Sequence, residues 1–101
     1  LPPLPAAVEV AAYRIVQEAL TNVARHSGAC TAGVVLRHEP GSLAVEVCDD
    51  GSGVVAPRPG GLGLVSMRER AEEIGGSAEM SAVVGRGTTL RAWLPLSGVA
   101  W

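Results

Sequence analysis

The 101-residue sequence contains no phenylalanine and no lysine, and it has only two tryptophans and one tyrosine. A hydrophobic core must therefore be built from Val, Leu, Ile, Ala and Met. The absence of lysine excludes the Gly-Lys-Ser/Thr element of a Walker phosphate loop. The net charge is −2 and no basic cluster is present, which argues against a nucleic-acid partner because such proteins usually carry a Lys/Arg footprint.

Cysteines and long apolar runs are also scarce. Cys30 and Cys48 are too few for a disulfide framework and lack metal-ligand spacing, so we expect each to be a small core residue. No apolar run is long enough for a membrane span, and there is no signal-peptide pattern. We therefore expect a cytoplasmic domain without membrane contact of its own, although a longer protein containing it can still be anchored in the inner membrane.

The composition, 48% hydrophobic and 18% charged, is that of a globular protein. The length suffices for one small domain with one core, so we expect residues 1–101 to form a single domain. Residues 1–6 contain Leu1-Pro-Pro-Leu-Pro5, a stiff extended segment predicted to be a linker or partial element. Residues 97–101 are predicted to be a C-terminal tail.

Hydrophobic periodicity predicts two helices, at residues 7–26 and 64–74, and four strands, at residues 32–38, 43–48, 77–84 and 88–96. The order helix, two strands, helix, two strands favours an α+β fold. We expect a two-layer α/β sandwich with both helices on one face of a mixed, mostly antiparallel sheet.

Several local features refine this prediction. Ser27-Gly28 is typical of a cap at the end of the first helix, and Gly75-Gly76 of the end of the second. Pro95 indicates that the end of the last strand lies at a sheet edge. The apolar stripe predicted for the first helix comprises Ala12, Ile15, Val16, Ala19, Leu20 and Val23.

The segment Asp49-Asp50-Gly51-Ser52-Gly53 directly follows a predicted strand. Glycine lets a ligand approach the main chain closely, and a carboxylate beside such a bend can accept hydrogen bonds from an amino group. Alone, this pattern is equally typical of an acidic hairpin loop.

Two further patterns are candidates for phosphate and cation binding. The glycines at 60, 61 and 63 lead directly into a helix, and the N–H groups at a helix N-terminus bind phosphate; an ordinary turn is the alternative. Glu18 and Asn22 lie four residues apart on the first helix, where an amide oxygen can hold Mg²⁺ and a carboxylate can accept a proton. The alternative is the solvated polar edge of an amphipathic helix.

Four segments together resemble the GHKL ATPases, the family of gyrase, Hsp90, histidine kinases and MutL-type proteins. Residues 13–26 resemble the N box, residues 49–53 the G1 box Asp-x-Gly-x-Gly, residues 61–64 the G2 box, and residues 85–89 the final Gly-x-Gly-Thr element. All four occur in the family's order and span nearly the whole chain. The resemblance implies a Bergerat ATP-binding fold.

Residues 17–22 and 63–71 are similar to the sensor histidine kinases paired with NarL/LuxR-type response regulators. The segment between the G1 and G2 boxes, residues 54–60, resembles the short ATP lid of this class, which lacks a Phe-rich box. The resemblance implies ATP and Mg²⁺ as ligands and a homodimeric full-length protein.

The resemblance also implies a role for each matching residue. Glu18 would be the catalytic base, Asn22 would hold Mg²⁺, and Arg25 would meet a phosphate. Asp49 would accept a hydrogen bond from the adenine amino group, and Gly51 and Gly53 would admit the base. His26, which stands where many members have Tyr, would also belong to the nucleotide site. Gly61, Gly63 and Leu64 would surround the phosphates, and Thr88 or Thr89 would lie near the adenine.

The function so implied is a catalytic domain that donates the γ-phosphoryl group of ATP to a His on a separate upstream dimerisation domain, for relay to a response regulator. The phospho-accepting motif and the strand that usually precedes Leu1-Pro-Pro-Leu are absent from these residues. We therefore expect nucleotide binding with little turnover, and a sheet edge open to pairing with another chain. The alternatives are a serine kinase of the anti-sigma-factor type and a nucleotide-binding interaction module without catalysis.

Overall fold

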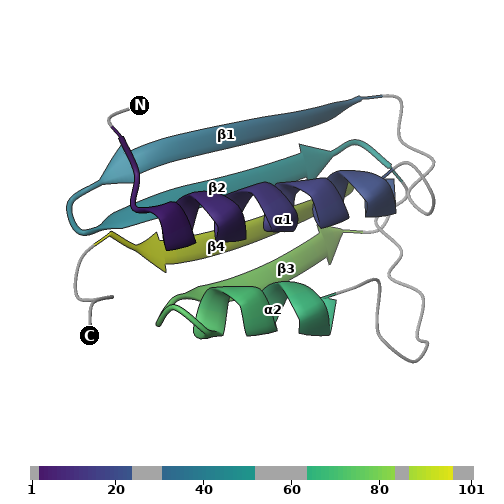
Figure 1. The fold of residues 1–101 in the computed structure, drawn as a ribbon. Helices are drawn as coiled ribbons and strands as arrows, with labels where there is room; N and C mark the ends of the chain where they lie inside the picture. The colour runs from purple at the N-terminus through teal and green to yellow at the C-terminus, as the bar shows by residue number, and fades with distance from the viewer. Residues whose placement is uncertain (1–2, 24–30, 52–63, 84–86, 97–101) are drawn as a thin grey trace.

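The computed structural model describes residues 3–23, 31–51, 64–83 and 87–96. Its six elements are α1 (Ala6–Asn22), β1 (Ala32–Glu39), β2 (Ser42–Asp49), α2 (Leu64–Glu72), β3 (Ser77–Val83) and β4 (Gly87–Pro95). Figure 1 shows both helices lying across the same side of the sheet. The described elements therefore confirm the predicted order of helices and strands.

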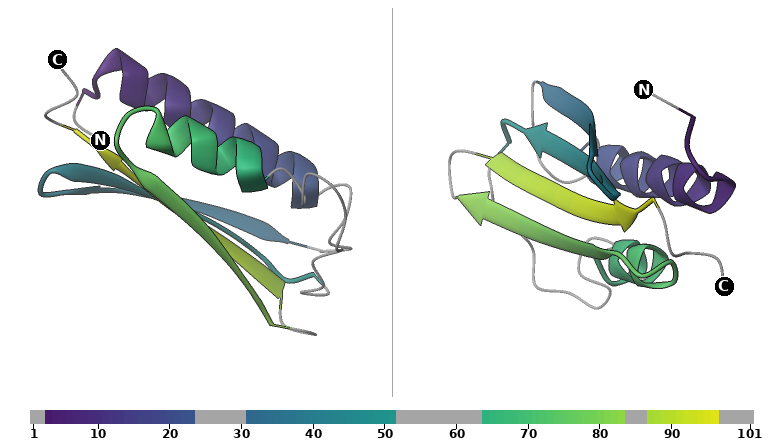
Figure 2. Two further views of the ribbon diagram at one scale, coloured as in Figure 1. Left: turned by 90° about the horizontal axis from the view of Figure 1, so that it is seen from below. Right: turned by 90° about the vertical axis from the view of Figure 1, so that its left-hand side faces the viewer.

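The sheet has the strand order β1-β2-β4-β3, and all three pairings are antiparallel. The first hairpin turns at Pro40-Gly41, where Gly41 has a φ of 79° that favours glycine. In Figure 2 the two helices form one layer and the strongly twisted sheet forms the other. The predicted two-layer α/β sandwich is confirmed.

The core lies between the helix layer and the sheet face beneath it. It is built from the expected residue types, and Ile15, Leu43, Met67 and Leu94 are its largest fully buried side chains. Alternate residues of β4, namely Leu90, Ala92 and Leu94, point into this core because side chains alternate between the faces of a strand.

Helix α1 begins at Ala6, and its first backbone hydrogen bond runs from Glu9 N to Pro5 O, at 3.0 Å. The buried stripe runs through Val8, Ala11, Ala12, Ile15 and Ala19. Leu20 was predicted to belong to this stripe but is 38% exposed. The buried stripe passes through residues 8, 12, 15 and 19. Leu20 lies about 100° around the helix axis from Ala19, which places it outside this stripe.

The predicted end of the first helix, with its cap at Ser27-Gly28, lies outside the described residues. In the part of the chain that the structure describes, neither helix is long and apolar enough to cross a membrane.

Helix α2 ends in the manner that its glycines predict. Gly75 N donates to Glu72 O at 3.0 Å and Gly76 N donates to Ala71 O at 2.8 Å, the paired bonds of a Schellman motif. Gly75 has the positive φ, 84°, that this motif requires. A Cβ atom at Gly76 would overlap the carbonyl oxygen of Trp93, so the second glycine permits β4 to pass closely.

The prediction that Pro95 marks a sheet edge is wrong. Strand β4 lies inside the sheet, between β2 and β3. Pro95 is tolerated because it is the last residue of β4 and because the pairing of β4 with β3 ends two residues earlier, at Ser77 and Trp93. No ladder hydrogen bond to β3 is therefore required from the residue that lacks an N–H.

The face of the sheet that the helices leave uncovered carries polar groups. Glu46 accepts a hydrogen bond from Arg91 Nε at 3.0 Å and lies 3.9 Å from Arg37 Nη2. The hydrogen bond from Arg91 is the main cause that lowers the pKa of Glu46. Cys48 is half-buried on this face and is not a core residue, contrary to prediction, and burial raises the pKa of its thiol. Cys30 lies outside the described residues.

Candidate nucleotide-binding site

Those predicted site residues that the structure describes lie at one end of the sandwich. The C-terminal end of α1, the end of β2, the start of α2 and the start of β4 meet there, at the right of Figure 1. The opposite end holds the β1–β2 turn and the α2–β3 turn. The antiparallel topology thus brings together segments that are far apart in the sequence.

Asp49 and Thr88 are direct cross-strand neighbours at this end. Both side chains belong to the face covered by the helices, because they alternate in phase with the core residues Val47 and Leu90. Both are half-buried. A carboxylate and a hydroxyl opposite each other form a small polar area at the margin of an apolar core, suited to a polar edge of a ligand.

Thr89 lies on the opposite face of the sheet. Its Oγ1 donates to Cys48 Sγ at 3.8 Å, among the polar groups that the helices leave uncovered. The two threonines were interchangeable in the sequence prediction, and strand alternation separates them. The geometry favours Thr88 over Thr89 as the ligand-side residue.

The turn after β2 is held by the two aspartates. Gly51 N donates to Asp49 Oδ1 at 2.8 Å, so the Asp49 side chain folds back on its own turn. Thr31 N donates to Asp50 Oδ1 at 2.9 Å, and Asp50 N donates to Thr31 O at 3.3 Å. Asp50 therefore fastens the turn to the beginning of β1, a positioning role that the sequence pattern did not distinguish from that of Asp49.

Gly87 also shapes this end of the sheet, although it was not among the predicted site residues. Its φ is 100°, and a Cβ atom there would overlap the carbonyl oxygen of Asp49 and lie 3.1 Å from the Cα of Asp50. Only glycine lets β4 start this close to the Asp49 turn. The signal was present in the sequence, since Gly87 belongs to the Gly-x-Gly-Thr element.

Glu18 and Asn22 project from the last turns of α1, and both are half-buried. Glu18 Oε2 is buried and has no hydrogen-bond partner among the described residues. A buried carboxylate oxygen without a partner is costly, so its surroundings suit a water molecule or a ligand group. This buried, unpartnered oxygen is the observation by which the residues fit a hydrated cation.

No group of three or more His, Cys, Asp or Glu side chains that could hold a metal ion occurs within residues 3–23, 31–51, 64–83 and 87–96. A cation held by Asn22 would thus take most of its ligands from phosphate and water, as Mg²⁺ usually does in proteins.

The structure does not describe every predicted site residue. Arg25, His26, Gly53, Gly61 and Gly63 lie outside the described residues, as does the predicted lid at residues 54–60. Leu64 is the first residue of α2, so the helix starts directly after the G2-like segment, as predicted.

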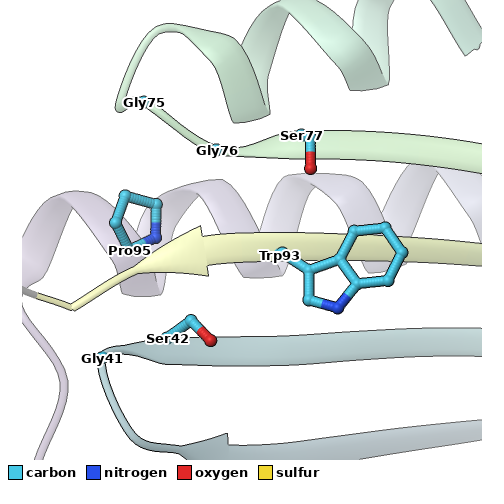
Figure 3. A pocket seen from close by; sticks show the side chains of 7 residues that line it. All are labelled: Gly41, Ser42, Gly75, Gly76, Ser77, Trp93 and Pro95. Carbon is cyan, nitrogen blue, oxygen red and sulfur yellow. The ribbon is translucent and has the colours of Figure 1, made fainter.

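A separate hollow of about 250 Å³ lies at the far end of the sheet. Figure 3 shows the Trp93 ring between the strands that carry Ser42 and Ser77, with Pro95 beside it. Its lining contains none of the predicted site residues and no charged side chain. The candidate nucleotide site is therefore the Asp49 end, and this hollow is distinct from it.

Comparison with known proteins identifies the family of this chain. Residues 7–98 match the family model described as histidine kinase-, DNA gyrase B- and HSP90-like ATPase. The chain is 44% identical over 91 residues to the sensor histidine kinase LiaS of Bacillus subtilis, covering 88% of this chain and 25% of LiaS. It is also 44% identical over 84 residues to the sensor histidine kinase YxjM of the same organism, covering 83% of this chain and 20% of YxjM.

Among solved structures, the histidine kinase domain of a blue-light activated histidine kinase from Erythrobacter litoralis superimposes with a TM-score of 0.73 at 28% identity, covering 92% of this chain and 46% of that one. The present chain spans about a quarter or less of the length of LiaS and YxjM. By the match over residues 7–98, this chain belongs to the family of histidine kinase-, DNA gyrase B- and HSP90-like ATPases.

Proposed function

We propose that this chain is the ATP-binding catalytic domain of a sensor histidine kinase. It would bind Mg-ATP and donate the γ-phosphoryl group to a His on a separate dimerisation domain, for relay to a response regulator of the NarL/LuxR type. The observation that carries the proposal is the pairing of Asp49 with Thr88 on the helix-covered face, at the end of the sheet where α1 and α2 meet.

The adenine would lie against the Asp49 turn. One carboxylate oxygen of Asp49 is held by Gly51 N, which fixes the side chain and leaves the second oxygen to accept a hydrogen bond from the adenine amino group. The hydroxyl of Thr88 can act as donor or acceptor beside it, directly or through a water. Gly87 supports this arrangement because it permits β4 to start against the Asp49 carbonyl.

The phosphates would extend toward α1 and the start of α2. Asn22 would hold Mg²⁺, and Arg25 would meet a phosphate oxygen. The cation would neutralise phosphate charge, which phosphoryl transfer needs more than covalent chemistry from the protein. Glu18, whose Oε2 is buried without a partner among the described residues, would accept the proton or orient the attacking group.

The nature of the phosphate acceptor rests on the relatives. LiaS and YxjM are named as sensor histidine kinases, which favours a His acceptor over the Ser acceptor of an anti-sigma-factor kinase. Because residues 1–101 cover only a fifth to a quarter of those relatives, the acceptor, the response regulator and dimerisation of a longer protein all belong to the proposal. The isolated chain is expected to bind nucleotide with little turnover.

Calorimetric titration with ADP and Mg²⁺ tests the proposal. We expect Asp49→Ala to weaken binding about tenfold or more, because it removes a hydrogen bond to a charged group. The matched control is Glu79→Ala, which removes an exposed carboxylate from β3 and should bind as the parent does. A folded parent that binds no nucleotide, or an Asp49→Ala variant that binds equally well, would refute the proposal.

A further inference from the structure

Two adjacent carboxylates stand at the end of β2, and they have different partners. Asp49 is half-buried on the helix-covered face, and its Oδ1 accepts a hydrogen bond from Gly51 N at 2.8 Å. Asp50 is exposed, and its Oδ1 accepts a hydrogen bond from Thr31 N at 2.9 Å. The proposed nucleotide contact belongs to Asp49 alone, so a role for Asp50 in binding must follow from its contact with Thr31.

The contact between Asp50 and Thr31 consists of two hydrogen bonds. Asp50 N donates to Thr31 O at 3.3 Å, and Thr31 N donates back to the Asp50 side chain. The two residues directly follow the pair of Ala32 and Asp49, with which the β1–β2 register ends. In an antiparallel ladder, a hydrogen-bonded pair exchanges both bonds through main-chain groups. Here a side-chain oxygen replaces one carbonyl, so this pair depends on which residue stands at position 50.

Strand β4 limits the same turn from the other side. Asp49 pairs with Thr88 of β4. The preceding residue, Gly87, lies so close that a Cβ atom there would be 3.1 Å from the Cα of Asp50. The turn after β2 is therefore enclosed by close packing against β4 and is fastened to the start of β1 by the bonds between Asp50 and Thr31.

We propose that Asp50 is a positioning residue for nucleotide binding. By bonding to Thr31 it fixes the turn in which Gly51 N holds one oxygen of Asp49, and it thereby keeps the second oxygen of Asp49 oriented for the adenine amino group. Asp50 itself does not touch the nucleotide. This role rests on the proposed function, since it requires Asp49 to be the adenine contact.

The size of the effect follows from preorganisation. Asp50 directly precedes Gly51, so loss of the contact with Thr31 frees the residue whose N–H holds Asp49 Oδ1. The Asp49 carboxylate then samples several orientations, and nucleotide binding has to order it again. Ordering one mobile side chain on binding weakens the affinity by about 2- to 12-fold. The loss is smaller than the loss expected for Asp49→Ala, which removes the contact altogether.

Calorimetric titration with ADP and Mg²⁺ compares two substitutions of Asp50. Asp50→Ala removes the acceptor for Thr31 N, and its affinity should fall by about 2- to 12-fold. Asp50→Asn keeps an Oδ1 that can accept the same bond but removes the charge, so it should restore most of the affinity. If Asp50 acted only by repelling the phosphates, both variants would bind more tightly than the parent. Glu79→Ala, which removes an exposed carboxylate from β3, is the matched control and should bind as the parent does.

A double-mutant cycle with Asp49→Ala separates positioning from a general loosening of the fold. Once Asp49 is replaced, Asp50→Ala should cost little further affinity, because no carboxylate remains to be held in place. A loosened fold would instead weaken binding equally in both backgrounds. Hydrogen exchange of the Thr31 amide reports the contact directly. It should be slow in the parent and in Asp50→Asn, and about tenfold or more faster in Asp50→Ala.

Failure of this role and failure of the proposed function give different results. A folded parent that binds no nucleotide, or an Asp49→Ala variant that binds equally well, removes the adenine contact on which both depend. Weakened binding by Asp49→Ala with unchanged binding by Asp50→Ala would overturn the positioning role alone. So would equal losses from Asp50→Ala in the two backgrounds, or an Asp50→Asn variant that protects the Thr31 amide but binds no better than Asp50→Ala.

Discussion

The two faces of the sheet are built from the same strands but have different chemistry. On the helix-covered face, β2 and β4 present Val45, Val47, Leu90 and Leu94, which are almost fully buried. On the uncovered face the same two strands present the Glu46–Arg91 ion pair. Neighbouring residues of one strand therefore contribute to stability in one case and to surface charge in the other.

The difference between the two faces of the sheet also bears on the candidate site. Asp49 and Thr88 continue the buried face beyond the end of the core, where aliphatic side chains give way to polar ones. Thr89, the next residue, faces the uncovered side and contacts Cys48. The helix-covered face thus changes from apolar core to polar surface along its length, and the proposed nucleotide site lies where that change occurs.

The largest expected difference between the faces concerns stability. Leu94 is fully buried, and Leu94→Ala should lower the free energy of unfolding by about 2–5 kcal/mol because it leaves a cavity in the core. Arg91→Ala, on the same strand but on the uncovered face, is the matched control and should change it far less. Urea unfolding followed by circular dichroism measures both. Equal losses from the two variants would contradict the assignment of the faces.

A smaller difference is expected in nucleotide binding. Thr88→Val keeps the shape of the side chain and removes its hydroxyl, so the affinity for ADP should fall by about 2- to 12-fold, the value of one hydrogen bond. Thr89→Val makes the same chemical change on the other face and should leave the affinity unchanged. Calorimetric titration compares the pair. A loss with Thr89→Val alone would place the ligand on the wrong face for our proposal.

The smallest effect is expected for the ion pair of the uncovered face. The hydrogen bond from Arg91 lowers the pKa of Glu46 in the folded state. A lowered pKa stabilises the fold above the ordinary pKa of glutamate, and this contribution is lost as the pH falls through the lowered value. Glu46→Gln should therefore lower the melting temperature slightly at pH 7 and not at all in strong acid. A difference in melting temperature that persists unchanged in strong acid would show that the ionised Glu46 is not the source of the stabilisation.

Much of the local structure follows from the sequence because its causes are local. The period of the apolar residues sets each helix and strand, and Gly75-Gly76 end α2 by a motif that needs a positive φ. The Asp-x-Gly-x-Gly and Gly-x-Gly-Thr elements likewise depend on backbone conformations that are set within a few residues. Their resemblance to the family's motifs made Asp49 and the two threonines candidate site residues before any fold was known.

Other features depend on which strands become neighbours, and the sequence gives no local signal for that. Pro95 was expected at an edge, but β4 lies inside the sheet, and the short register with β3 makes its missing N–H harmless. Cys48 looked like a core residue, but strand parity places it on the uncovered face.

The sequence by itself thus determined the elements, their order and the residue types available for binding nucleotide. Only the tertiary structure decided that Thr88 rather than Thr89 stands opposite Asp49, and that Gly87 must lack a side chain. The physical reason is that conformational preferences act over a few residues. Strand pairing and the exposure of each side chain are instead set by residues far apart in the sequence: Ser42 on β2 pairs with Pro95 on β4, 53 positions away.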